Sequence, residues 1–207
     1  MVAIEGRDVA QAMRLHGPTG RVFGFVMERL SAPNYRWVMA QLTGLRPQSY
    51  LEIGFGTGEL AQLVARKLQP ARLVAVDPSE LKVRSARRKL EPFAEYSRIE
   101  LLHGDDTAIA SLGGPFDAIV ATHSFQFWRN PMATLARIHA LIGPDGLLIV
   151  VLRKRKTRKV QKWIPNPITR SGDEIGGARQ ALADAGFLTI ADKRLRTGSH
   201  GLIAIKN

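Results

Sequence analysis

A carboxylate and three closely spaced glycines stand together in "YLEIGFGTGEL", residues 50–60. Directly after an apolar run, every second residue is a glycine, at Gly54, Gly56 and Gly58, and Glu52 precedes the first of them by two positions. A loop without side chains lets a ligand approach backbone N–H groups at a helix start. Because a tight turn with positive φ would also explain the glycines, the surrounding residues must decide between turn and ligand site.

The residues around the loop argue against two common phosphate ligands. A nucleoside triphosphate loop reads GxxxxGK[ST], and no lysine stands at that place. A dinucleotide loop reads GxGxxG, and its third glycine would fall at position 59, where this chain has Glu59. A carboxylate at Glu52 would repel a pyrophosphate and would suit an ammonium or sulfonium centre. The pattern therefore favours a ligand with a cationic centre.

Alternating strands and helices are expected to position this loop. Short apolar runs predict strands, and apolar residues at helical spacing predict helices between them. This order is typical of βαβ units in a mostly parallel sheet. The strands are predicted at 49–53, 72–76, 98–102, 116–121 and 146–152, and the helices at 58–68, 79–90, 131–142 and 173–187, with a short segment near 106–112. Two final strands, separated by the turn signal "RTGS", complete the sheet.

The chain is expected to form one domain of 207 residues, 1–207. Residues 1–47 read as an N-terminal helical cap, in which "HGPTG" and "SAPN" separate the helical stretches, and 48–207 form the α/β core. No run of about 18 apolar residues predicts a transmembrane helix, and the N-terminus does not read as a signal peptide. The chain has no cysteine, which excludes disulfides, thiolate metal sites and a catalytic thiol. We expect a cytoplasmic protein.

Positive charge is concentrated in one segment. The formal net charge is +12, and "RKRKTRKVQK" at 153–162 contains seven basic residues and no acid. Such a balance is typical of proteins with anionic partners, although a basic run is also typical of a solvated face. Both interpretations stay open.

"LEIGFGTG" resembles motif I of the class I S-adenosylmethionine-dependent methyltransferases. The pattern [DE]xGxGxG is met by Glu52, Gly54, Gly56 and Gly58. "VAVDPS" resembles the second motif, whose acid, here Asp77, binds the ribose hydroxyls in that family. "HGDD" resembles the loop whose acid contacts the adenine, and either Asp105 or Asp106 fits that role. "FDAIVATHSFQFWRNP" and "LARIHALIGPDGLLIV" resemble the strand 4 motif and the turn before strand 5.

This resemblance covers roughly residues 18–152 and is most similar to the small-molecule subgroup called type 11. It implies a Rossmann-like methyltransferase fold, with a seven-stranded, mostly parallel sheet whose last strand is antiparallel. It implies S-adenosylmethionine as cofactor and a small-molecule methyl acceptor. The cofactor site that it implies comprises Glu52, Gly54, Phe55, Gly56, Gly58, Asp77, Pro78, Asp105, Asp106 and Thr122.

His123 is the candidate catalytic residue, as a general base or as a group that orients the acceptor. It follows strand 4, at the edge where open parallel sheets bind ligands. Phe125, Phe127 and Trp128 come next, and such aromatics either wall an apolar pocket or pack in the core. No pattern of metal ligands is present: Ala121 and Thr122, at the place where metal-dependent relatives have acids, do not suit a hard cation.

Two functions remain open from the sequence. One is methylation of a small molecule, which is anionic if the basic segment recruits it. The other is an RNA methyltransferase or a nucleic-acid-binding protein that uses 153–162. We prefer the first, because only Trp163 lies near the basic segment as a stacking aromatic. The segment 153–172 is predicted to form a mobile positive flap beside the acceptor entrance. The acceptor atom and the oligomeric state are not predicted.

Overall fold

The computed structural model describes residues 18–153 and 172–207, with the side chains of 31–153 and 174–207. Two predicted features lie outside these residues: the helical stretch that precedes "HGPTG", and most of the basic segment including Trp163. Arg153, the first residue of that segment, is described. The flap prediction for 153–172 therefore stays a prediction.

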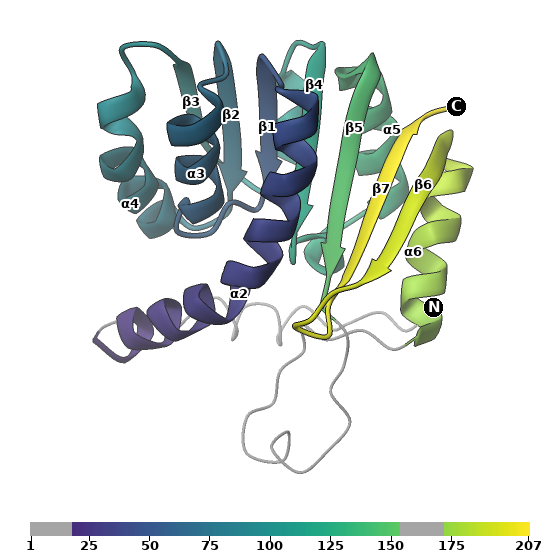
Figure 1. Ribbon diagram of the computed structural model, residues 1–207, viewed down its shortest axis with the longest axis horizontal. Helices are drawn as coiled ribbons and strands as arrows, with labels where there is room; N and C mark the ends of the chain where they lie inside the picture. The colour runs from purple at the N-terminus through teal and green to yellow at the C-terminus, as the bar shows by residue number, and fades with distance from the viewer. Residues whose placement is uncertain (1–17, 154–171) are drawn as a thin grey trace.

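A seven-stranded sheet forms the centre of the molecule, as predicted (Figure 1). The strand order is β3-β2-β1-β4-β5-β7-β6. All neighbouring strands pair in parallel except for β7, which is antiparallel to both β5 and β6. The strands are β1 (Ser49–Ile53), β2 (Arg72–Asp77), β3 (Arg98–His103), β4 (Phe116–Thr122), β5 (Ile142–Leu152), β6 (Phe187–Arg194) and β7 (His200–Lys206).

Helices cover both faces of the sheet (Figure 1). On the near face lie α2 (Pro18–Leu45), α3 (Glu59–Leu68) and α4 (Glu80–Leu90). On the far face lie α5 (Pro131–Leu141) and α6 (Gly172–Asp184). Short 3-10 turns connect them: η1 (Glu91–Phe93), η2 (Asp106–Ser111) and η3 (Phe125–Phe127). Every predicted core helix is present, and the Rossmann-like methyltransferase fold is confirmed.

Two expectations about element boundaries were wrong. "SAPN" does not separate two helices, since α2 runs through it as one helix of 28 residues with Pro33 inside. The ribbon changes direction within α2 (Figure 1), as expected for a helix with an internal proline, which lacks an N–H donor. Strand β5 begins at Ile142 rather than at 146, because Ile142 already pairs with Phe116 before a register shift. The predicted turn before strand 5 is therefore part of the extended strand.

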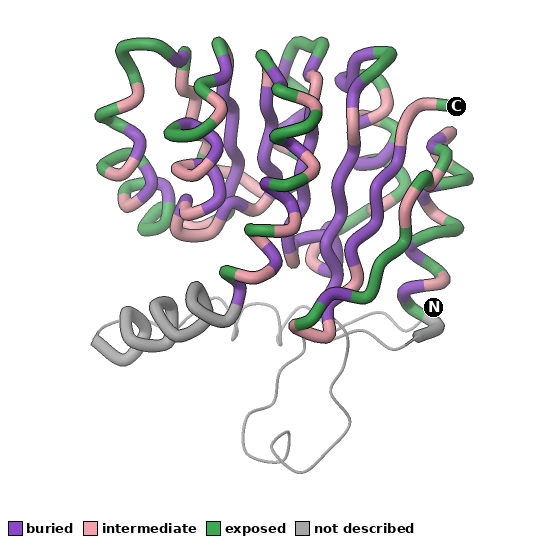
Figure 2. The backbone as a smooth tube through the Cα atoms, in the orientation of Figure 1, coloured by how far each residue is buried: buried purple, intermediate pink, exposed green. Residues whose placement is uncertain are grey.

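The apolar core has two parts, one on each face of the sheet. Alternation along β1 divides its side chains, so that Leu51 and Ile53 face α5 and α6 while Tyr50 faces α2 and α3. The central strands are buried along most of their length (Figure 2), which is typical of a parallel sheet covered on both faces. This packing holds the strand ends, and the loops that follow them, in fixed positions.

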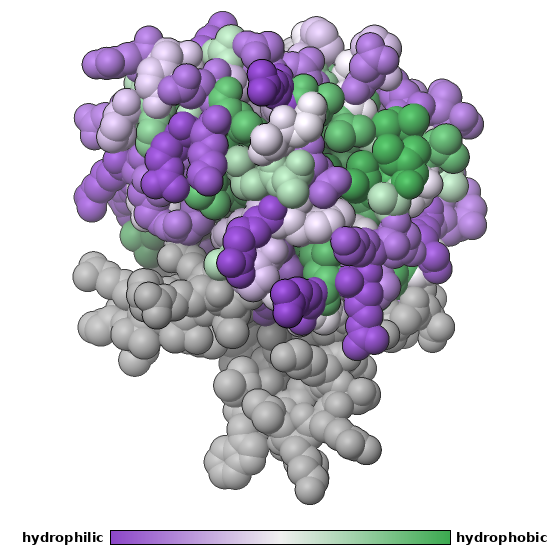
Figure 3. Space-filling model, in the orientation of Figure 1, coloured by the Kyte–Doolittle hydropathy of each residue, from purple (hydrophilic) through white to green (hydrophobic). Residues whose placement is uncertain are grey.

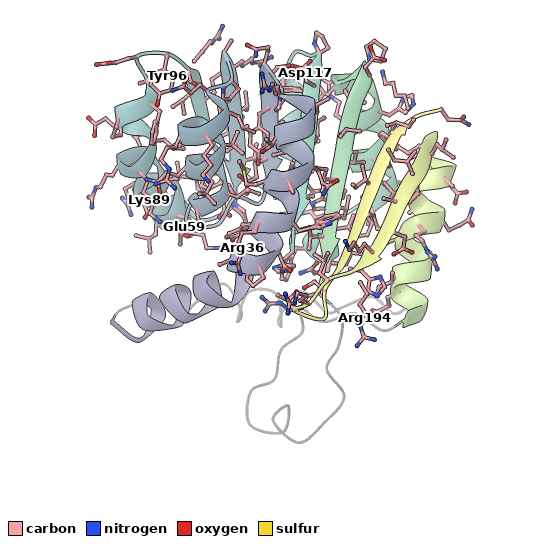
Figure 4. The ribbon with its side chains drawn as sticks, viewed as in Figure 1. Arg36, Glu59, Lys89, Tyr96, Asp117 and Arg194 are labelled. Atoms are coloured by element: carbon pink, nitrogen blue, oxygen red, sulfur yellow. The ribbon has the colours of Figure 1, made fainter. Side chains whose placement is uncertain are left out.

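Polar contacts tie the elements together at both ends of the sheet (Figure 4). At the amino ends, Asp117 on β4 accepts hydrogen bonds from the backbone N–H groups of Gln48 and Ser49 at 2.7 and 2.8 Å. These bonds fix the start of β1 against β4. Between α3 and α4, Lys89 forms an ion pair with Glu59, and both side chains lie between the two helices in Figure 4.

One part of the sheet has an apolar surface open to solvent. Leu188 and Ile190 on β6 are 51% and 52% exposed, and a hydrophobic area is visible over the right-hand part of the sheet in Figure 3. None of the helices that the structure describes is long and apolar enough to cross a membrane.

Candidate functional site

The glycine loop connects β1 to α3 at the carboxyl end of the sheet. All three glycines have positive φ, at 80°, 60° and 82° for Gly54, Gly56 and Gly58. A Cβ atom at Gly54 would come within 2.4 Å of Ser124, and one at Gly58 within 2.8 Å of Ala86. A Cβ atom at Gly56 would meet no atom within 4 Å. The two outer glycines are therefore needed for packing, and Gly56 faces open space.

Asp77 ends β2 directly beside this loop. Its Oδ2 accepts a 2.8 Å hydrogen bond from the Gly56 N–H, and its Oδ1 accepts a 2.9 Å bond from the Ser79 N–H. The side chain of Lys82 lies 3.9 Å from Oδ1. Burial raises the pKa of Asp77, while Lys82 and the two backbone donors lower it, and the net shift is upward. The carboxylate is thus oriented by the loop that it faces.

Glu52 is a second buried carboxyl group at the same place. It is 2% exposed on β1, and the Tyr50 hydroxyl donates to its Oε2 at 3.1 Å. Burial raises the pKa of Glu52 to about 8, the nearby charge of Asp77 adds to this rise, and the bond from Tyr50 opposes it. An acid with this pKa is mostly protonated at neutral pH and becomes charged when a cation approaches.

These residues fit a nucleoside with a cationic centre. The open space at Gly56 lies beside a carboxylate suited to accept from hydroxyl groups, and Glu52 adds a carboxyl group suited to a cation. Among the described residues, no group of three or more His, Asp or Glu side chains is placed to hold a metal ion. The site is suited to bind an adenosyl sulfonium.

Comparison with known proteins agrees with this geometry. The family model for a methyltransferase domain matches residues 51–148, which include the glycine loop, Asp77 and the end of β4. The matched residues, 51–148, form a methyltransferase domain similar to those of the class I S-adenosylmethionine-dependent methyltransferases. The prediction of this family from the sequence is confirmed, and S-adenosylmethionine is the cofactor of the family.

Individual methyltransferases are similar to different lengths of this chain. An uncharacterized methyltransferase of Bacillus subtilis, YdaC, is 22% identical over 135 residues, which cover 65% of this chain and 72% of YdaC. A demethylmenaquinone methyltransferase of Bacteroides fragilis is 26% identical over 110 residues, covering 53% of this chain and 45% of that protein. This chain thus spans less than half of that relative.

A solved structure supports the fold. The crystal structure of a SAM-dependent methyltransferase from Aquifex aeolicus superposes with a TM-score of 0.66 at 20% identity. The superposition covers 84% of this chain and 89% of that one. At this identity the likeness concerns the fold alone.

The other residues predicted to bind the cofactor differ in their surroundings. The ring of Phe55 is buried in the core on the near face of the sheet, and its backbone N–H donates to the Val76 carbonyl at 3.3 Å. Pro78 is exposed after Asp77, and its carbonyl oxygen lies 3.1 Å from His103 Nε2. Thr122 is buried at the end of β4, and its hydroxyl has no hydrogen-bond partner in the described part of the chain. An unpaired buried hydroxyl at this edge is suited to a ligand.

The two rival acids after β3 have different partners. The side chain of Asp106 is buried and accepts a hydrogen bond from Thr134 on α5. Asp105 caps η2 by accepting from Thr107, and it forms a 3.0 Å ion pair with Arg129. These contacts lower the pKa of Asp105 and keep it charged. Of the two carboxylates, that of Asp105 is the more accessible.

His123 lies directly after β4, and the next residue, Ser124, contacts the glycine loop. Its neighbour Ser124 packs on Gly54 and donates to the Ile53 carbonyl. The backbone of His123 has a φ of 57°, which is uncommon for a residue other than glycine. Its N–H donates to Val151 at 2.8 Å. Burial and the charge of Arg153 lower the pKa of His123 to about 3, so the ring is neutral at physiological pH.

The aromatics after His123 are mostly core residues. Phe125 and Trp128 are buried, with ring centroids 4.8 Å apart, and they pack against the far-face core. Phe127 is only partly buried. The interpretation of these aromatics as the wall of an apolar pocket therefore does not hold for Phe125 and Trp128.

Sequence reasoning missed Asn34. Its Nδ2 lies 3.1 Å from His123 Nε2, although it stands in "SAPN", which had been assigned to a break between helices. No motif marks it, because its partners are 89 or more positions away.

Proposed function

We propose that the chain transfers a methyl group from S-adenosylmethionine to a small-molecule acceptor. One observation supports this best: Glu52 and Asp77, two buried carboxyl groups on adjacent strands, flank a glycine loop with open space at Gly56. Bound S-adenosylmethionine supplies an electrophilic methyl on a sulfonium, which is already a good leaving group. The protein's task is then to orient donor and acceptor.

The proposed cofactor contacts follow the strand ends. Asp77 accepts from the ribose hydroxyls, Asp105 or Asp106 accepts from the adenine amino group, and Glu52 lies on the side of the cationic centre. The glycine loop, Phe55 and Pro78 offer backbone groups, and Thr122 offers its unpaired hydroxyl. The demethylmenaquinone methyltransferase that resembles this chain supports a small-molecule acceptor by its name.

We propose that His123 orients the acceptor rather than serving as a general base. An imidazole whose pKa is about 3 is a weak base at neutral pH. Its strained backbone is consistent with a functional position. Asn tolerates positive φ, so His123→Asn keeps the backbone and removes the imidazole. We expect turnover to fall by about 10²-fold or more with cofactor affinity unchanged. Unchanged turnover in His123→Asn would remove His123 from the reaction.

The positive charge supports an anionic acceptor. Arg153 directly follows β5 and is close enough to His123 to influence its pKa, and the chain's net charge is +12. The same charge favours the second candidate, an RNA methyltransferase or nucleic-acid-binding protein using 153–162. A cytoplasmic location also stays a prediction.

Binding and transfer measurements test the proposal. Calorimetric titration is expected to give one site for S-adenosylhomocysteine and none for a nicotinamide dinucleotide. Radiolabelled methyl from S-adenosylmethionine is expected to enter the small-molecule fraction of a cell extract. Label that enters RNA instead would support the second candidate, and absence of S-adenosylhomocysteine binding would contradict both.

A further inference from the structure

Three polar side chains, from two segments far from His123 in the sequence, form a hydrogen-bond network at its imidazole. Asn34 comes from α2 and is 1% exposed. Thr197 and Ser199 come from the turn between β6 and β7. Asn34 Nδ2 lies 3.1 Å from His123 Nε2 and donates to Ser199 Oγ at 3.2 Å, and Thr197 Oγ1 donates to Asn34 Oδ1 at 2.6 Å.

The donors and acceptors can be followed from the β6–β7 turn toward His123. The Ser199 backbone N–H donates to Thr197 Oγ1 at 3.3 Å, and the Thr197 hydroxyl in turn donates to Asn34 Oδ1. With Oδ1 engaged as acceptor, the NH₂ group of Asn34 faces the imidazole. An amide NH₂ only donates, and therefore His123 Nε2 must accept. The single proton of a neutral ring then resides on Nδ1.

The surroundings keep the ring neutral. Burial and the positive charge of Arg153, at the end of β5, both disfavour the imidazolium. No acidic side chain makes a hydrogen bond or ion pair with His123 among the described residues. The tautomer is thus the variable that the neighbouring side chains can set.

We propose that Asn34 is a positioning residue that holds His123 as its Nδ1-protonated tautomer, and that Thr197 sets the orientation of the Asn34 amide. The ring then presents an N–H donor to the acceptor, while Nε2 stays engaged. The importance of this for turnover rests on the proposed function of His123, but the tautomer itself does not. The same bonds link α2 and the β6–β7 turn to the loop after β4.

Nitrogen NMR of the intact chain, with ¹⁵N-labelled histidine, tests the inference without an activity assay. The chain has five histidines, and His123→Asn assigns the signal. In the wild type we expect the Nδ1-protonated pattern, unchanged from pH 5 to pH 8. An Nε2-protonated ring in the wild type would overturn the inference.

Two variants change the network at different points. Thr197→Val keeps the side-chain shape but removes the hydroxyl, so the amide is free to turn and a mixture of tautomers is expected. Asn34→Asp replaces the NH₂ group with an acceptor, so the proton is expected to move to Nε2 and the ring to become protonated at higher pH. Ser199→Ala separates the two possible partners of Nε2: it removes the Ser199 hydroxyl, whose Oγ lies 3.4 Å from His123 Nε2, and leaves the Thr197–Asn34–His123 bonds in place. If Asn34 sets the tautomer, Ser199→Ala should keep the wild-type pattern. If both folded variants keep the wild-type tautomer, the inference is wrong.

Turnover separates this inference from the proposed function. In Asn34→Asp we expect kcat to fall at least about tenfold with the cofactor Kd unchanged, and the pH profile to follow the new titration of His123. A changed tautomer with unchanged kcat would support the positioning role of Asn34 and contradict the role of His123 in the reaction. A lower kcat with an unchanged tautomer would contradict the positioning role alone.

Discussion

The backbone N–H of Gly56 donates a 2.8 Å hydrogen bond to Oδ2 of Asp77, across the space between two adjacent strand ends. This bond joins the glycine loop to the acid that follows β2, and the Ser79 N–H holds the other oxygen. The carboxylate therefore has a fixed orientation before a ligand arrives. Such preorganisation reduces the free energy lost when a ligand binds.

Gly54 and Gly56 are expected to respond differently to alanine. In Gly54→Ala the new methyl group would lie 2.4 Å from Ser124, and the residue has positive φ, so we expect a stability loss of roughly 1–3 kcal/mol. In Gly56→Ala no atom is met within 4 Å, and only the φ of 60° is unfavourable. We therefore expect a smaller stability loss, about 1 kcal/mol, with a clear loss of cofactor affinity.

Urea unfolding together with calorimetry checks this contrast. If Gly56→Ala binds S-adenosylhomocysteine as tightly as the wild type, the space at Gly56 does not belong to the cofactor site.

The pKa of Glu52 predicts how stability depends on pH. The folded chain keeps a proton on Glu52 up to about pH 8, whereas the unfolded chain loses it near the ordinary glutamate pKa of 4.5. Between these values the folded state binds more protons, so the free energy of unfolding falls as pH rises, by at most about 1.4 kcal/mol per pH unit. The stabilising contribution of protonated Glu52 is complete below the pKa that this group has in the unfolded chain. It is lost as the pH rises past the pKa of Glu52 in the folded protein.

The Glu52→Gln variant has no titrating group at this position. Its free energy of unfolding should therefore fall less steeply with pH than that of the wild type. Urea unfolding at pH 5, 6, 7 and 8 measures the difference between the two chains. Parallel curves for wild type and Glu52→Gln would mean that Glu52 is already ionised in the folded protein.

Affinity for the cofactor should rise with pH, because the raised pKa of Glu52 keeps this group protonated in the free protein at neutral pH. A cationic sulfonium or ammonium favours the charged form of Glu52, so binding releases a proton below about pH 8. Calorimetry of S-adenosylmethionine in two buffers with different ionisation enthalpies counts that proton. Glu52→Gln should release fewer protons than the wild type, and equal release would assign the proton to another group.

Arg153 is expected to affect the acceptor and not the cofactor. If an anionic acceptor is recruited, Arg153→Gln should raise its KM, and salt should do the same as the Debye length shrinks from about 10 Å at 0.1 M to about 3 Å at 1 M. Arg66→Gln is the matched control, because Arg66 is an exposed residue of the last turn of α3. If neither salt nor Arg153→Gln changes the KM, the positive charge has no role in recruiting the acceptor.

Local patterns in the sequence were sufficient to predict most of the fold. The period of two in β1 and the helical spacing in α3 are set by near neighbours, and both elements lie within one or two residues of the prediction. Pro33 misled the prediction of α2, because tertiary packing keeps that helix continuous through a residue that is unfavourable inside helices. Local propensity did not decide that element.

The site was predictable to the extent that it follows strand ends. Glu52, Asp77 and His123 stand at fixed offsets from β1, β2 and β4, and the sheet order brings β1 beside both other strands. Asn34 and Thr197 were not predictable, because their place beside His123 depends on how α2 and the β6–β7 turn pack. Likewise, the depressed pKa of His123 results from burial, which no local pattern reveals.

The role of Asp77 is tested most directly by comparing two aspartates that each accept two backbone N–H bonds at opposite ends of the sheet. Asp77 lies at the carboxyl ends and Asp117 near the amino ends. Calorimetric titration of S-adenosylhomocysteine into Asp77→Asn should show a loss of roughly 1–3 kcal/mol in binding free energy, because a ribose hydroxyl loses a charged acceptor. Asp117→Asn should lower stability and leave the Kd unchanged. Wild-type affinity in a folded Asp77→Asn variant would contradict the assignment of the cofactor site.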